Sequence, residues 1–119
     1  MSRDNAYLRD VLDSARAIQS YLLGLNRDLF EASQEKQDAV IRRYEIMGEA
    51  ARHLSPEARV ALPEIPWRLI TGMRNILIHD YDDVDAGTLW DTAQADLPAL
   101  ILRLDSHLAQ QPPPANPPV

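Results

Sequence analysis

The spacing of the apolar side chains constrains the fold of this 119-residue chain more than any other feature. In four long segments they recur every three or four residues, which matches the turn of an α-helix and not the alternation of a β-strand. The four rows are Tyr7, Leu8, Val11, Ala15, Ile18, Leu22 and Leu25; Val40, Ile41, Tyr44, Met47, Ala51 and Leu54; Trp67, Ile70, Met73, Leu77 and Ile78; and Leu89, Ala93, Leu97, Leu100, Leu104 and Leu108. The pattern predicts an all-α protein.

Capping residues predict where the first two helices begin and end. Asp4 or Asn5 is a competent N-cap for the first helix, and Gly24 with Asn26 indicates its end. The second helix is expected to begin between Asp28 and Ser33, and the serine is its candidate cap.

The second helix carries small residues at Gly48, Ala50 and Ala51, so another helix could approach closely there. It is expected to end before Pro56, because proline disfavours the helical conformation in the residue that precedes it. The proline-rich connector that follows is expected to hold one helical turn over residues 56–60.

The third helix is predicted to start at Pro66-Trp67 and to end at the acidic run Asp80–Asp83. The fourth runs from about Asp85 to Gln110, and Pro98 inside it should kink the helix or remove one hydrogen bond. Four amphipathic helices with short connections predict an antiparallel four-helix bundle with a short extra helical turn.

The composition fits one domain. Hydrophobic residues make up 45% of the chain, enough for a core within residues 1–110, whereas the proline-rich residues 111–119 are expected to form a disordered or extended tail. The chain has no cysteine, which excludes disulfides and thiolate metal sites. It starts polar, unlike a signal peptide, and no apolar run approaches the ~20 residues of a membrane span. We therefore expect a cytoplasmic protein with no membrane partner.

The charge is unevenly distributed along the chain. The net charge of −6 argues against a nucleic-acid partner, since phosphate binding depends on Lys and Arg. Residues 42–79, however, carry 6 arginines against 4 glutamates, and residues 80–106 carry 1 arginine against 7 aspartates. The middle of the chain is therefore locally positive. The acidic part could be a surface for a basic partner or only a solvated helix face.

The segment Arg74–Tyr81 carries the residues best suited to chemistry. Arg74 offers a permanent planar cation for phosphate oxygens, and His79 is the kind of side chain that transfers protons near neutral pH. Together they could cleave a phosphodiester without a metal. Asn75 precedes His79 by four residues and shares its helix face, so Asn75 could orient the histidine.

An ideal helix does not place Arg74 and His79 on one face. Five residues rotate by about 500°, which leaves the two positions roughly 140° apart. Either the helix ends or loosens near His79, or the two side chains reach one cleft from different directions. A cleft at a subunit interface would relax this constraint, since each site could draw residues from two copies.

Each motif residue also has a purely structural explanation. Arg74 could be an ion-paired surface residue, His79 could interact with the helix dipole, and Tyr81 could be a partly buried aromatic. The spacing of an arginine and a histidine alone is therefore weak evidence.

Other chemistries have less support. The chain lacks the glycine patterns of phosphate-binding and dinucleotide-binding loops. His53, His79 and His107 lack the spacing of a zinc site, and the aspartates at 80–85 lack the glycine and glutamate of an EF-hand. We expect no metal and no cofactor.

The motif belongs to a longer stretch that resembles a known family. The relevant residues are 39–51, 66–75, 78–81, Leu89-Trp90 and 96–98. They resemble the HEPN superfamily, specifically the HepT toxins of toxin–antitoxin pairs whose partner is the minimal nucleotidyltransferase MntA. The G-E-A block at 48–50, followed by the G-M-R-N-x-x-x-H-x-Y block at 72–81, is specific, and the resemblance covers most of residues 4–108.

The resemblance implies an all-α homodimer with the arginine–histidine motifs at the subunit interface. It also implies a metal-independent ribonuclease acting on RNA, with transfer RNA among the targets of the family. Arg74 and His79 would be catalytic, and Asn75 or Asp80 would position the histidine. Tyr81 would be the residue that the partner nucleotidyltransferase modifies with AMP to silence the toxin.

Two other hypotheses remain open from the sequence. One is a non-catalytic HEPN module that binds a nucleotide or the partner transferase. The other is a purely structural helical dimer whose motif residues are ion-paired. A nuclease assay would separate the first from the enzyme. Toxicity on expression that His79→Ala relieves would argue against the second.

Overall fold

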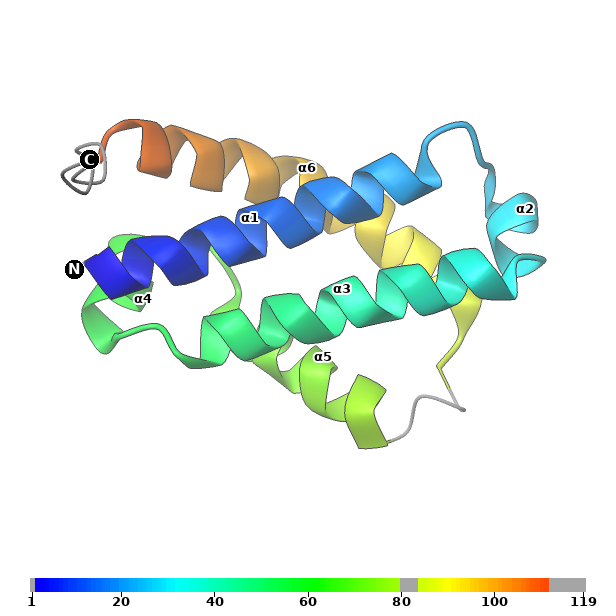
Figure 1. Cartoon of the computed structure of the whole chain (residues 1–119), viewed down its shortest axis with the longest axis horizontal. Helices are drawn as coiled ribbons and strands as arrows, with labels where there is room; N and C mark the ends of the chain where they lie inside the picture. Colours follow the sequence, from blue (N-terminus) through cyan, green and yellow to red (C-terminus); the bar gives the residue numbers. More distant parts are fainter. Residues whose placement is uncertain (1, 80–83, 112–119) are drawn as a thin grey trace, which may run out of the picture.

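In the computed structural model, residues 2–79 and 84–111 are described, and all their regular structure is helical (Figure 1). This confirms the all-α class that the apolar spacing predicts. The helices are α1 (Ser2–Leu22), α2 (Arg27–Glu31), α3 (Gln34–Arg52), α4 (Pro56–Ala61), α5 (Trp67–His79) and α6 (Ala86–Ala109). None of these helices is long and apolar enough to cross a membrane.

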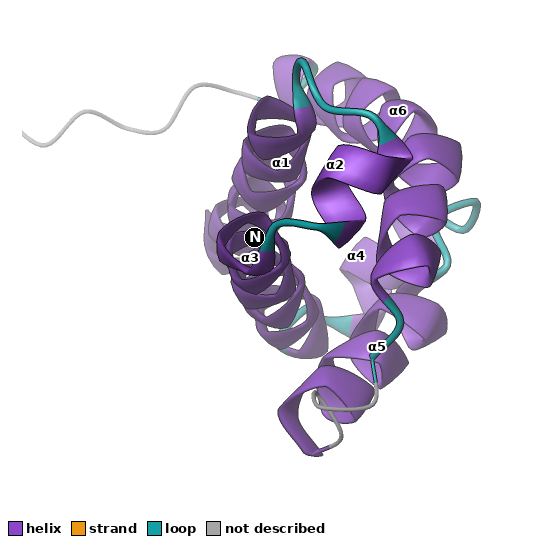
Figure 2. Cartoon of the chain, turned by 90° about the vertical axis from the view of Figure 1, so that its right-hand side faces the viewer, coloured by secondary structure: helices purple, strands orange, loops and turns teal. Residues whose placement is uncertain are grey.

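Helix α3 makes the contacts that organise the bundle. It packs along α1 and also along α5, while α1 packs in addition against α6 (Figure 1). The view along the bundle in Figure 2 shows α1 and α3 on one side and α6 on the other. The predicted rows of α1, α3 and α6 form most of the core, to which α5 adds Trp67 and Leu77. Phe30, Leu62 and Ile65 also belong to the core.

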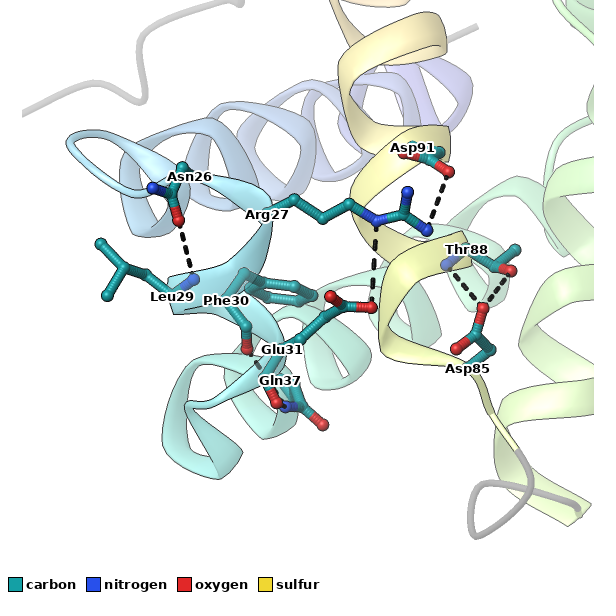
Figure 3. Close-up of polar contacts among 9 residues, drawn as sticks. All are labelled: Asn26, Arg27, Leu29, Phe30, Glu31, Gln37, Asp85, Thr88 and Asp91. Carbon is teal, nitrogen blue, oxygen red and sulfur yellow. Dashed lines mark hydrogen bonds and ion pairs between the residues drawn. The ribbon is translucent and has the colours of Figure 1, made fainter.

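The short helix α2 differs from the expectation of one continuous second helix. Ser33 adopts an extended conformation (φ −112°, ψ 98°) and caps α3, where its hydroxyl accepts a hydrogen bond from Lys36 N at 3.2 Å. Asn26, expected to mark only the end of the first helix, caps α2 through Leu29 N at 2.8 Å (Figure 3). Two caps only seven residues apart therefore divide the predicted helix, and Phe30 of α2 is buried against the core.

The expected capping role of Asp4 or Asn5 in the first helix is wrong. The helix begins at Ser2, and Asp4 lies in its first turn, nearly buried. Its Oδ1 accepts a hydrogen bond from Ser55 N at 3.0 Å, and its Oδ2 accepts one from Ser55 Oγ at 2.6 Å. These bonds hold the pKa of Asp4 below its ordinary value. Asp4 thus connects the start of α1 to the start of α4.

The remaining boundaries agree with the sequence. Ser55 caps α4, α5 begins at Trp67, and Asp85 caps α6 through Thr88 N. Pro98 lies inside α6, which continues past it. The predicted exit at residues 80–83 and the tail at 112–119 lie outside the described residues.

Candidate functional site

Helix α5 lies against α3 at Gly48. A Cβ added to this glycine would overlap the Cβ of Arg74 and would lie 3.0 Å from both Arg74 Cγ and the Ile70 carbonyl oxygen. Neither the Arg74 Cβ nor the Ile70 backbone can move aside unless α5 itself moves. The expectation that a small residue admits a close helix here is confirmed, and the residue admitted is Arg74.

The side chain of Arg74 is held against α3. Only 22% of it is exposed, and its Nη2 lies 3.1 Å from Glu49 Oε2. Its Nη1 donates a hydrogen bond to Asn75 Oδ1 at 2.9 Å, whereas its Nε is buried with no hydrogen-bond partner among the described residues. The Glu49 contact lacks the alignment of a hydrogen bond, so charge attraction is what holds Arg74 to α3.

Glu49 also contacts two further basic residues, Arg52 in the last turn of α3 and His53 at its C-cap. Its Oε1 lies 3.1 Å from His53 Nε2 and 3.8 Å from Arg52 Nη2. The hydrogen bond with His53, and then the charges of Arg52 and Arg74, hold the pKa of Glu49 below its ordinary value. The His53 ring stacks on Tyr7 of α1, with centroids 5.3 Å apart. We refer to Gly48, Glu49, His53 and Arg74 as the Arg74 site.

The Arg74 site opens into a cleft between α1, α3 and α5. Its lining includes His53, the carboxylates of Asp10, Glu45 and Glu49, and the guanidinium groups of Arg42 and Arg74. The locally positive sequence therefore does not give a positive cleft in one copy of the chain, since α1 contributes an additional carboxylate.

The structure describes only some of the predicted site residues. Asn75 is exposed and hydrogen-bonded to Arg74. Helix α5 remains helical to His79, so positions 74 and 79 lie roughly 140° apart around its axis. The side chain of His79 and all of Asp80 and Tyr81 lie outside the described residues.

Within residues 2–79 and 84–111, no helix covers a second face of α5. Leu69 is 73% exposed and Ile76 is 57% exposed, and a Cβ on Gly72 between them would meet nothing within 4 Å. Helical spacing places these three residues in one row along α5. Position 79, three residues after Ile76, lies in the same row. We refer to Leu69, Gly72 and Ile76 as the outer row of α5.

The sequence motifs did not indicate the contacts that Glu49 and His53 make with each other. Glu49 belongs to the G-E-A block, and His53 is a histidine without the spacing of a zinc site. The four-residue interval between them was a usable signal, since such pairs face each other on a helix. The partner on α5 could not be inferred from that interval.

The family model described as Ribonuclease HepT-like matches residues 11–106. The matched segment includes the α3–α5 contact and both motif positions, Arg74 and His79. The molecule is thus an all-α ribonuclease. More specifically, the chain belongs to the HepT-like ribonuclease family, as its sequence motifs predicted.

Named relatives agree with this assignment. A Methanocaldococcus jannaschii protein whose name combines gamma-glutamylcyclotransferase with RNase is 43% identical over 94 residues, which is 79% of this chain but only 42% of that protein. A second protein of that organism, named as an RNase, is 36% identical over 95 residues, covering 80% of this chain and 87% of its own. A Thermococcus cleftensis protein named as a probable ribonuclease HepT is 37% identical over 94 residues, covering 79% and 86%. No solved structure matches the chain significantly.

Proposed function

We propose that this chain is the toxin of a toxin–antitoxin pair and an endoribonuclease that cleaves RNA, with transfer RNA as the first target to test. We further propose that it needs no metal or other cofactor and acts in the cytoplasm. The observation that carries the proposal is the Arg74 site. A largely buried guanidinium, fixed between two helices in the segment that matches a ribonuclease family, suits the binding of a phosphoryl group.

The proposed reaction uses the 2′-hydroxyl of RNA as the nucleophile. His79 accepts the proton of this hydroxyl, whose oxygen attacks the adjacent phosphorus. The bond from phosphorus to the 5′-oxygen breaks, and a second histidine or water returns a proton to that oxygen. Arg74 stabilises the charge that develops on the non-bridging oxygens, and Asn75 or Asp80 positions the histidine. The products are a 2′,3′-cyclic phosphate and a 5′-hydroxyl.

A homodimer is proposed to complete the site. The outer row of α5 leaves apolar side chains in solvent, which a second copy would cover. In one copy the cleft beside Arg74 holds more carboxylates than guanidinium groups, so a phosphate would benefit from cations of a second copy. The angle of roughly 140° between positions 74 and 79 also favours a site that two copies share.

Regulation is proposed to occur at Tyr81. A partner nucleotidyltransferase would transfer AMP from ATP to the phenolic oxygen, with pyrophosphate as the leaving group. The added bulk and negative charge two residues from His79 would oppose RNA binding. Incubation with the cognate transferase and ATP should add AMP to the wild type and not to Tyr81→Phe. Equal modification of the variant would exclude Tyr81 as the target.

The cleavage assay uses RNA, the full chain and a chelator. The wild type should produce 2′,3′-cyclic phosphate ends with the chelator present, and His79→Ala should not. Circular dichroism and native mass should be the same for both proteins. Full cleavage by a folded His79→Ala protein would rule out the mechanism.

The dimer is tested separately with Leu69→Glu. A charge in the outer row should convert the protein to monomers in native mass measurements and reduce RNA cleavage. Val60→Glu is the matched control, because Val60 is equally exposed on α4, away from the outer row. An unchanged native mass for Leu69→Glu would exclude this interface.

One observation favours a second function, the non-catalytic binding module. Arg74 is already ion-paired with Glu49 in a cleft that contains two further carboxylates, Asp10 and Glu45. Such a pair also occurs for structural reasons. A wild-type protein that binds its transferase but leaves RNA intact would support the module.

A further inference from the structure

The contacts of Glu49 distinguish it from an ordinary surface carboxylate. Exposed ion pairs between long side chains contribute little, because both partners move. Here the Arg74 stem is confined by its contact with Gly48, and 22% of the side chain is exposed. Glu49 itself is 42% exposed, but both of its oxygens have a partner, since Oε1 lies 3.1 Å from His53 Nε2 and Oε2 lies 3.1 Å from Arg74 Nη2.

The histidine that holds Glu49 is itself supported. Its ring stacks on Tyr7 at an interplanar angle of 21°, so a residue of α1 restricts the position of the His53 ring at the C-cap of α3. A continuous series of contacts therefore runs from Tyr7 through His53 and Glu49 to Arg74, and it connects α1, α3 and α5.

We propose that Glu49 is a positioning residue for RNA cleavage, which acts through Arg74 and is itself held by His53. This inference rests on the proposed ribonuclease function. Glu49 fixes the guanidinium against α3 by charge, and Asn75 uses one Nη1 hydrogen. The terminal nitrogens keep further N–H groups, which can bind two phosphoryl oxygens in a fixed orientation.

The same geometry predicts opposite effects on binding and on turnover. The Glu49 carboxylate repels an approaching phosphate, so its charge opposes RNA binding. It also prevents the guanidinium from swinging, which favours the transition state, because a misplacement of about 1 Å can cost about 100-fold in rate. A residue that only stabilised the fold would not separate kcat from KM in this way.

The test is Glu49→Gln, which keeps the shape of the side chain and removes its charge. We expect kcat for RNA cleavage to fall by about tenfold or more, while KM stays the same or falls. Glu49→Asp keeps the charge at shorter reach and should recover part of kcat. Glu31→Gln is the matched control, because Glu31 pairs with Arg27 at 3.9 Å on the short helix α2. Its kcat should equal that of the wild type.

A second readout does not require activity. The Nε–H resonance of Arg74, assigned through its absence in Arg74→Lys, should shift or broaden in Glu49→Gln and stay unchanged in Glu31→Gln. An unchanged resonance or an unchanged kcat in folded Glu49→Gln would overturn the proposal. If the wild type cleaves no RNA, the proposed function fails, and the resonance still decides whether Glu49 positions Arg74.

Discussion

Two arginines in this protein lie against a glycine of another helix, and the two sites behave differently. At the Arg74 site, the glycine contacts the stem of the arginine and a backbone carbonyl of the same helix. At the second site, which comprises Arg27, Glu31, Gly87 and Asp91, the glycine meets only the mobile ends of Arg27 and Glu31. Figure 3 shows Arg27 reaching from α2 to Asp91 on α6. The same residue types therefore give a fixed cation at the Arg74 site and a weakly held surface ion pair at the Arg27 site.

The exposed fractions of the two arginines and their distances to the paired carboxylates also distinguish the two sites. Arg74 is 22% exposed and lies 3.1 Å from its carboxylate. Arg27 is 51% exposed and lies 3.9 Å from Glu31 and 3.4 Å from Asp91. An exposed pair at these distances has little energy and no fixed direction. Burial and a contact at the root of the side chain are what hold the Arg74 guanidinium in one place.

The largest difference is expected when each arginine is removed. Arg74→Ala should lower kcat for RNA cleavage by about 100- to 1000-fold, the usual loss when a group that stabilises transition-state charge is deleted. Arg27→Ala should leave kcat unchanged and alter the free energy of unfolding by about 1 kcal/mol or less. Metal-free cleavage kinetics and urea denaturation measure the two effects. Comparable losses of activity would show that the two sites do not differ in function.

Replacing the glycines should separate the sites by stability. Gly48→Ala forces α5 away from α3, with an expected loss of about 1–3 kcal/mol in the free energy of unfolding. Gly87→Ala displaces only side-chain ends, and alanine is the better helix former, so its stability should be equal or slightly higher. Urea denaturation of both variants measures the difference. A stable Gly48→Ala protein with wild-type kcat would contradict the close contact at Arg74.

A third comparison uses pH. The folded-state pKa of Glu49 is lowered, first by the His53 hydrogen bond and then by the charges of Arg52 and Arg74. Its ionised form therefore contributes stability that is fully present above the ordinary value of 4.5 and is lost as the pH falls through the lower folded-state pKa. The stability advantage of the wild type over Glu49→Gln should be present where Glu49 is ionised and should shrink as the pH falls through the lower folded-state pKa. A difference that is independent of pH would mean that the Glu49 charge does not stabilise the fold.

The smallest effect is expected at Asp91. Asp91→Asn neutralises the α6 carboxylate that pairs with Arg27 of α2. The side chains of Arg27 and Asp91 are both more than half exposed. The free energy of unfolding should change by less than about 0.5 kcal/mol, and added salt should reduce the change further. A salt-independent loss of more than about 1 kcal/mol would show that the tie between α2 and α6 is stronger than its geometry indicates.

The sequence was sufficient for most of the features that depend on near neighbours. Ser33, Ser55 and Asp85 each cap a helix through a backbone N–H three residues ahead, and such caps can be recognised from the sequence. The separate helix α2 was missed because Asn26 fits the end of one helix as well as the start of the next. Asp4 was assigned to the wrong partner, since its hydrogen bonds go to Ser55, 51 residues away.

The Arg74 site also combines features that the sequence predicts with features that only the tertiary structure shows. The sequence by itself determined that Arg74 lies on an amphipathic helix, that this helix ends near His79, and that Gly48 permits a close approach. Those properties follow from helical period and side-chain size. Only the tertiary structure decided that Arg74 faces α3, pairs with Glu49 and leaves Leu69 and Ile76 uncovered. The physical reason is that the rotation of one helix against another depends on the packing of the whole core, which no local spacing specifies.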